Sequence, residues 1–149
     1  MFGNDSVVFQ FTGPFGVRVE IGQSLAMLVL FIGLMSGGNI VNGLIFAAML
    51  VAAIFLHEMG HAAGCLVQGV PVRRVMLHGG GGFCEPARST TRRESEFIVV
   101  AGPLMNLALW ALASLAFKAI LTGDLYYSPT MMTLAGYLRI FSFLNFLKF

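Results

Sequence analysis

The chain has 149 residues, of which 57% are hydrophobic and 11% are charged. Soluble domains average about 45–50% apolar and about 25% charged residues, so this composition excludes an ordinary soluble domain and indicates an integral membrane protein in contact with the lipid bilayer. A net charge of +2 is too small to indicate nucleic acid as a partner. The length suffices for a single core, residues 1–149, of about four membrane spans.

A short N-terminal β-hairpin and a short apolar helix are the first expected elements. Residues 7–20 alternate apolar and polar side chains on either side of Gly13-Pro14, which predicts two strands around a turn. The apolar residues 21–36 then predict a first membrane span of about 24 Å, which is short unless its flanks extend it.

Three longer apolar segments, residues 40–67, 97–121 and 131–149, predict three more spans. Together with the first they predict an all-α polytopic membrane protein of about four transmembrane helices. The loop of residues 68–96 holds five arginines, whereas the turns after the first and third spans hold no Arg or Lys. The positive-inside rule therefore places the N-terminus and this loop in the cytosol.

Residues 57–61 spell His-Glu-Met-Gly-His, an H-E-x-x-H motif near the far end of the second expected span. Residues four apart share a helix face, so His57 and His61 can bind one metal ion, and Glu58 is placed to take up a proton from water. A charged residue inside a span costs roughly 2.5–3.5 kcal/mol, which favours a functional interpretation. The alternative is a histidine pair buried in a helix bundle and bonded to neighbouring carbonyl groups. The motif lies roughly 15 Å from the cytosolic end of its helix.

The cytosolic loop contains a second candidate region. Residues 70–77 are rich in β-branched side chains and partly alternate, which predicts a strand, and the four glycines of residues 79–82 follow shortly afterwards. Glycines permit close backbone approaches, so one interpretation is a strand whose free edge pairs with an extended substrate; the other is a plain flexible linker. The candidate substrate-binding residues are Arg73, Val75, Leu77, Gly80 and Gly81.

Several blocks in the right order resemble the site-2 protease family of intramembrane zinc metalloproteases. The blocks are the strand pair at residues 9–20, the motif at 57–61, the strand and glycines at 72–82, and Ala101-Gly102-Pro103-Leu104-Met105-Asn106, which is similar to the family's A-G-P-x-x-N motif. The resemblance implies a zinc metalloendopeptidase that cleaves transmembrane segments of other membrane proteins, in regulated intramembrane proteolysis. It implies one zinc ion bound by His57 and His61, with Glu58 as general base.

Asn106 and Gly102 also have an interpretation without the family. Gly102 permits close helix approach, and Asn106 is a polar side chain that should face protein within a span. Asn106 is therefore a candidate catalytic residue, and a packing and hydrogen-bonding role is the alternative.

A catalytic zinc site usually has three protein ligands and one open position, and the chain supplies two clear ligands. In the family the third ligand is an Asp in an N-x-x-P-x-x-x-L-D-G type segment, which the sequence lacks. We expect this Asp beyond Phe149, in which case the chain is a truncated form whose own activity the sequence does not establish.

Two other functions stay open on the sequence alone. One is a non-catalytic relative that binds transmembrane substrates without cutting them, or a truncated inactive form. The other is a metal-handling membrane protein that uses the histidine pair. The expected partners are a transmembrane protein substrate and the bilayer, and the sequence does not indicate the oligomeric state.

Overall fold

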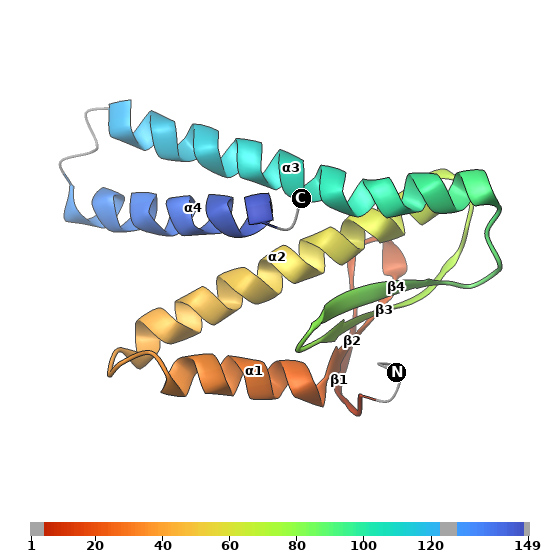
Figure 1. The fold of residues 1–149 in the computed structure, drawn as a ribbon, viewed down its shortest axis with the longest axis horizontal. Helices are drawn as coiled ribbons and strands as arrows, with labels where there is room; N and C mark the ends of the chain where they lie inside the picture. The colour runs from red at the N-terminus through yellow and green to blue at the C-terminus, as the bar shows by residue number, and fades with distance from the viewer. Residues whose placement is uncertain (1–4, 123–127, 148–149) are drawn as a thin grey trace. The chain divides into compact units, whose positions relative to one another are not determined.

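The computed structural model describes residues 5–122 and 128–147. These residues form the following elements in chain order (Figure 1): β1 (Val7–Thr12), the 3₁₀ turn η1 (Pro14–Gly16), β2 (Arg18–Gly22), α1 (Gln23–Leu34), α2 (Ile40–Val67), β3 (Val72–His78), β4 (Gly81–Pro86), α3 (Arg92–Thr122) and α4 (Pro129–Leu147). The chain divides into two compact units, Met1–Gly102 and Pro103–Phe149, each described by itself below. That residues 1–149 act as one core stays a prediction.

Four helices carry the fold, as the composition predicts, but the first is shorter than expected. Within the described ranges, α2, α3 and α4 are the helices that are long and apolar enough to cross a membrane. α1 has 12 residues, against the 16 of the span expected at 21–36. The difference arises because β2 continues to Gly22 and because α1 ends at Leu34, with Met35 as its C-cap. The chain then turns at Gly37 and Gly38, whose φ angles of 63° and 95° suit glycine.

The four strands form one sheet in the order β1-β2-β3-β4. β1 and β2 pair antiparallel, which confirms the expected N-terminal hairpin, and so do β3 and β4. β2 and β3 run parallel, joined through α1 and α2. β3 therefore has a neighbouring strand on each side, and the edge expected to be free at residues 73–77 is paired with β2 over residues 75–77. In this sheet the edge strands are β1 and β4.

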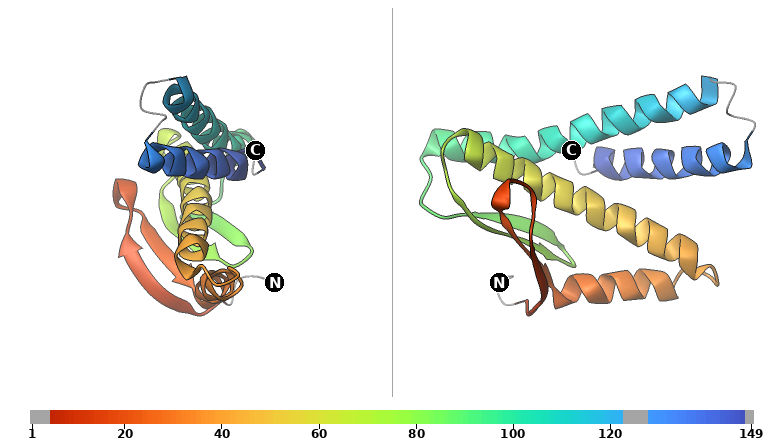
Figure 2. Two further views of the ribbon diagram at one scale, coloured as in Figure 1. Left: turned by 90° about the vertical axis from the view of Figure 1, so that its left-hand side faces the viewer. Right: turned by 180° about the vertical axis from the view of Figure 1, so that it is seen from behind.

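The inner face of the sheet packs against α2. Val19 pairs with Val75 and Ile21 with Leu77 across β2 and β3, so these side chains share one face. Val19, Val75 and Leu77 are buried in one cluster with Ile54 and Met59 of α2. Figure 2 shows the strands lying along one side of this helix. This packing fixes the sheet beside the part of α2 that carries the H-E-x-x-H motif.

The outer face of the sheet carries charged side chains in ion pairs. Arg74 donates hydrogen bonds to Glu20 and to Glu85, each at 2.7 Å, and Arg73 donates to Glu85 at 3.0 Å. Glu20 is only 6% exposed, so its carboxylate depends on Arg74 for its charge partner. The hydrogen bond from Arg74, with help from Arg73, holds the pKa of the Glu85 carboxyl below its usual range.

We expect Arg74→Gln to lower the free energy of unfolding by about 1–3 kcal/mol, because it removes the charged hydrogen-bond donor of the buried Glu20 carboxylate. Thermal unfolding of the purified protein in detergent measures the loss. Arg92→Gln is the matched control, since the Arg92–Glu96 pair on α3 is exposed and such pairs contribute about 0–1 kcal/mol. Equal losses in the two variants would contradict this account.

Candidate metal centre and catalytic site

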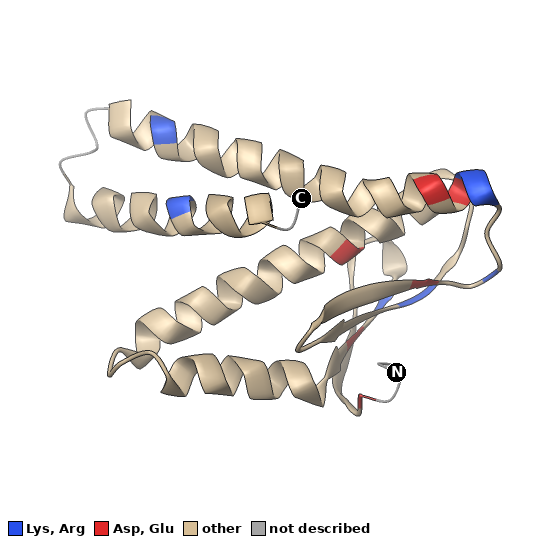
Figure 3. Cartoon of the chain, in the orientation of Figure 1, with Lys and Arg blue, Asp and Glu red and all other residues tan. Residues whose placement is uncertain are grey.

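The H-E-x-x-H motif lies on α2, where the predicted helix brings its two histidines together. The Nε2 atoms of His57 and His61 are 3.2 Å apart, and the two rings meet edge to face with their centroids 4.8 Å apart. Glu58 is the one charged residue of α2, as Figure 3 shows by a single red band on this helix. The i, i+4 spacing thus gives two converging ring nitrogens beside one carboxyl group.

A backbone carbonyl of α3 fixes the orientation of the second histidine. The Nδ1 atom of His61 lies 2.7 Å from the carbonyl oxygen of Ile98. A carbonyl oxygen only accepts hydrogen bonds, so Nδ1 carries the proton and donates it, and Nε2 keeps its lone pair. A metal-ligating histidine generally uses its second nitrogen in this way. His61 therefore presents a neutral nitrogen toward His57, which fits a zinc ligand.

The main chain of α3 passes directly over the histidine pair at Gly102. A Cβ atom at this position would lie 2.4 Å from Nε2 of His61 and 2.9 Å from Nε2 of His57. The approach continues one turn away, where a Cβ atom at Gly64 would lie 2.8 Å from the Cβ of Ala101. The close helix approach predicted for Gly102 is therefore an approach to the two imidazoles, a partner that sequence reasoning does not identify.

The side chain of Glu58 on α2 lies next to the edge strand β4. Its residue is 5% exposed, and a Cβ atom at Gly82 would lie 2.6 Å from Cγ of Glu58. Gly82 belongs to the predicted glycine segment, but the candidates Gly80 and Gly81 lie in the turn and at the beginning of β4 and make no such contact. A glycine at 82 thus lets a free strand edge approach the carboxyl group.

A cysteine pair lies next to this contact. Cys84 of β4 packs next to Cys65 of α2. Burial raises the pKa of the Cys84 thiol to about 12, and the neighbouring Cys65 and Glu58 add to the effect.

No third metal ligand is found near the histidines in residues 5–122 and 128–147. Within these ranges no group of three or more His, Cys, Asp or Glu side chains is placed to bind a metal ion. The two histidines fit zinc in donor type and orientation, and the Asp expected beyond Phe149 stays a prediction.

The other predicted site residues lie in different environments. Val75 and Leu77 are buried against α2 and are paired with both β2 and β4, so they offer no free backbone edge. Arg73 is exposed on the outer face in its ion pair with Glu85. Asn106 lies in the second unit, fully buried, and neither atom of its amide has a hydrogen-bond partner among the described residues. An unbonded buried polar group costs about 1–3 kcal/mol, so packing alone is a poor explanation for this asparagine.

A histidine pair with an adjacent glutamate, carried on one of three apolar membrane-length helices, defines a membrane protein of the metalloprotease class. The model of Peptidase family M50 matches residues 45–145, and the chain belongs to this family. Membership and the three apolar helices make the chain an integral membrane protein, and they confirm the resemblance that the sequence motifs predict. The family is one of membrane metalloproteases that use zinc.

Two known proteins are similar to this chain. A protein of Synechocystis sp. that is named as a zinc metalloprotease is 34% identical over 95 residues, which cover 63% of this chain and 24% of that protein. The solved structure of the site-2 protease from Methanocaldococcus jannaschii shares the fold with a TM-score of 0.68 at 18% identity, over 93% of this chain and 64% of that one. The chain therefore spans about a quarter of the curated relative and less than two thirds of the solved one.

Proposed function

We propose that this chain forms the core of an intramembrane zinc metalloprotease, which cleaves peptide bonds within transmembrane segments of other membrane proteins. The observation that carries the proposal is the convergence of the His57 and His61 Nε2 atoms at 3.2 Å beside Glu58, on an otherwise uncharged apolar helix. A soluble protease has no need to place this motif on a membrane-length segment.

His57 and His61 are the residues that would hold the zinc ion, together with the Asp expected beyond Phe149. Zinc supplies Lewis acidity, which polarises the scissile carbonyl and lowers the pKa of water toward about 7. Glu58 takes the proton from the attacking water as general base and passes it to the leaving amine. Asn106 is the remaining polar candidate, and its unbonded amide suits a hydrogen bond to the substrate.

The edge strand β4 is the proposed substrate-binding strand, in place of β3. Helical peptide bonds are shielded by their own hydrogen bonds, so a transmembrane segment must unwind before it is cut, and its freed backbone groups need new partners inside the membrane. β4 pairs with β3 on one side, is an edge of the sheet on the other, and contacts Glu58 through Gly82. An unwound segment added to this edge gains backbone hydrogen bonds next to the general base.

The proposed topology has the N-terminus and residues 68–96 on the cytosolic side, because loops rich in arginine stay preferentially in the cytosol. The motif then lies roughly 15 Å below the cytosolic surface, at a depth that water reaches from that side.

Removal of zinc tests the proposal on a protein that extends through the third ligand. We expect the purified protein to hold one zinc ion per chain and to cleave a transmembrane substrate in liposomes. A chelator should abolish cleavage and added zinc should restore it, because the ion supplies the electrophile. Product formation on gels and metal analysis give the two readouts. Cleavage that continues at its full rate after the zinc has been removed would contradict the assignment.

A further inference from the structure

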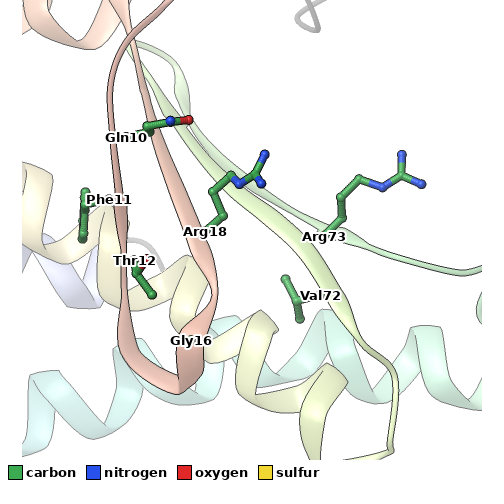
Figure 4. Close-up of a pocket in the computed structure, with 7 residues that line it drawn as sticks. All are labelled: Gln10, Phe11, Thr12, Gly16, Arg18, Val72 and Arg73. Atoms are coloured by element: carbon green, nitrogen blue, oxygen red, sulfur yellow. The ribbon is translucent and has the colours of Figure 1, made fainter.

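A polar pocket of about 440 Å³ lies on the outer face of the sheet, away from the histidine pair (Figure 4). None of its lining residues belongs to α2 or α3, so it is separate from the proposed catalytic site. Four of its seven lining residues are polar or basic, and the lining comes from the N-terminal hairpin and from the beginning of β3: Gln10, Phe11, Thr12, Gly16, Arg18, Val72 and Arg73.

Two guanidinium groups give this pocket its charge. Arg18 makes no ion pair and no side-chain hydrogen bond with any residue that the structure describes, and Arg73 shares Glu85 with Arg74. The charged groups of the outer face near the pocket are therefore three arginines against Glu20 and Glu85, which leaves one positive charge in excess. Figure 4 shows the ends of Arg18 and Arg73 pointing to the same side of the sheet.

The side chains beside the arginines complete a donor set for a phosphate group. The amide of Gln10 points to the same side as the two guanidinium groups in Figure 4, and Thr12 follows it on the same strand face. Guanidinium forks match the oxygens of a phosphate in a bidentate geometry, and amide and hydroxyl groups add neutral donors.

The hairpin that forms the pocket is apolar on its other side and at its tip. Phe9 alternates with Gln10 and is 60% exposed, whereas Phe11 borders the pocket and packs against Phe55 of α2. Phe15 at the tip is 69% exposed and has a φ of 60°, an unfavourable angle for a bulky residue that persists where a site requires it. Exposed aromatic residues next to a basic pocket are typical of a membrane–water interface.

We propose that the Arg18–Arg73 pocket binds the phosphate group of an anionic phospholipid. β2 leads from Arg18 into the apolar helix α1 without a linker, so the pocket is tied to the level at which the chain enters the bilayer. The exposed phenylalanines then contact acyl chains while the arginines bind the headgroup. The bound lipid anchors the hairpin, and with it the sheet that carries β4.

Lipid binding to the intact chain tests this site. The probe is phosphatidylglycerol against phosphatidylcholine, and the readout is the number of lipids retained per protein on release from mixed vesicles, measured by native mass spectrometry. We expect the preference for phosphatidylglycerol to fall about fivefold in Arg18→Gln, the typical effect of one basic residue near an anionic surface. Since Arg18 is exposed and has no partner among the described side chains, the variant should fold normally, and its melting temperature checks this.

Arg93→Gln is the matched control, because Arg93 is also an exposed arginine of residues 1–102 and its loss changes the net charge equally. A preference that falls equally in both variants would show general surface attraction and would overturn the pocket. Competition by inorganic phosphate in detergent distinguishes a lipid headgroup from a free phosphate ion as the ligand of the pocket. Displacement of the lipid by millimolar phosphate would assign the pocket to a soluble phosphate and overturn the lipid assignment, whereas retention of the lipid supports it.

Discussion

Glu58→Gln, in a protein that extends through the third metal ligand, should slow cleavage of a transmembrane substrate by about 10²–10⁴-fold while zinc stays bound. The amide of glutamine has nearly the shape of the carboxylate but cannot take a proton from water. His61 keeps its position, because its Nδ1 atom is held by the carbonyl of Ile98. Initial rates in liposomes and the zinc content of the same preparation give the two measurements.

The matched control for this substitution is Glu96→Gln, which removes one acidic group from the exposed first turns of α3. It should leave both the rate and the zinc content unchanged. Full activity in Glu58→Gln would remove Glu58 from the mechanism. Loss of zinc together with activity would show that the carboxyl group supports the metal and would leave the proton transfer to another residue.

Gly102→Ala should weaken zinc binding by about 100-fold or more, beyond the 10–100-fold typical of changes in groups that orient a metal ligand. The added Cβ atom would lie 2.4 Å from Nε2 of His61, so either the imidazole or the main chain of α3 must move. The atom that would be displaced is the nitrogen proposed to bind the metal. Competition with a chromophoric chelator measures zinc affinity directly and needs no proteolysis assay.

Gly136→Ala provides the control, because a Cβ atom at this position of α4 would meet nothing within 4 Å. Both variants make the same chemical change on an apolar helix. Zinc affinity that is unchanged in Gly102→Ala, with a normal melting temperature, would show that the space over the histidines is not needed for the metal. A fall in affinity that is equal in the two variants would point to a general effect on the helices.

Local sequence signals account for the helical part of the fold and for the histidine pair. The length of the apolar segment at residues 40–67 predicts α2 with its observed bounds, and a spacing of four residues on a helix brings the His57 and His61 nitrogens together. Both depend on interactions within one helix. This is why the central part of the candidate site is predictable without a structure.

The sheet could not be predicted in the same way, because its pairing is not local. Alternation identifies β2 and β3 as strands, but the whole of α1 and α2 separates them in the sequence. Which strands become neighbours is decided by how their inner faces pack against α2. The sequence therefore predicts a free edge on β3, whereas the structure places the edges at β1 and β4.

The contact partners of two glycines could not be predicted from the sequence for a related reason. Gly82 and Gly102 both lie in segments that sequence analysis selects, yet a glycine shows only that something is close. The neighbours are Glu58 for Gly82 and the two imidazoles for Gly102, residues that lie at least 20 positions away in the chain. Only the tertiary structure identifies these partners.

The contact between Gly82 and Glu58 keeps β4 and the carboxyl group at a fixed separation within one compact unit. On the proposed function, a substrate strand paired with β4 meets the general base at a depth that the enzyme determines. Moving a helix-breaking residue along the substrate then changes how readily the segment unwinds, while the cut stays at one level relative to the membrane surface. Such an enzyme would select substrates by how readily their transmembrane helix unwinds at that level, and would depend little on the side chains next to the scissile bond.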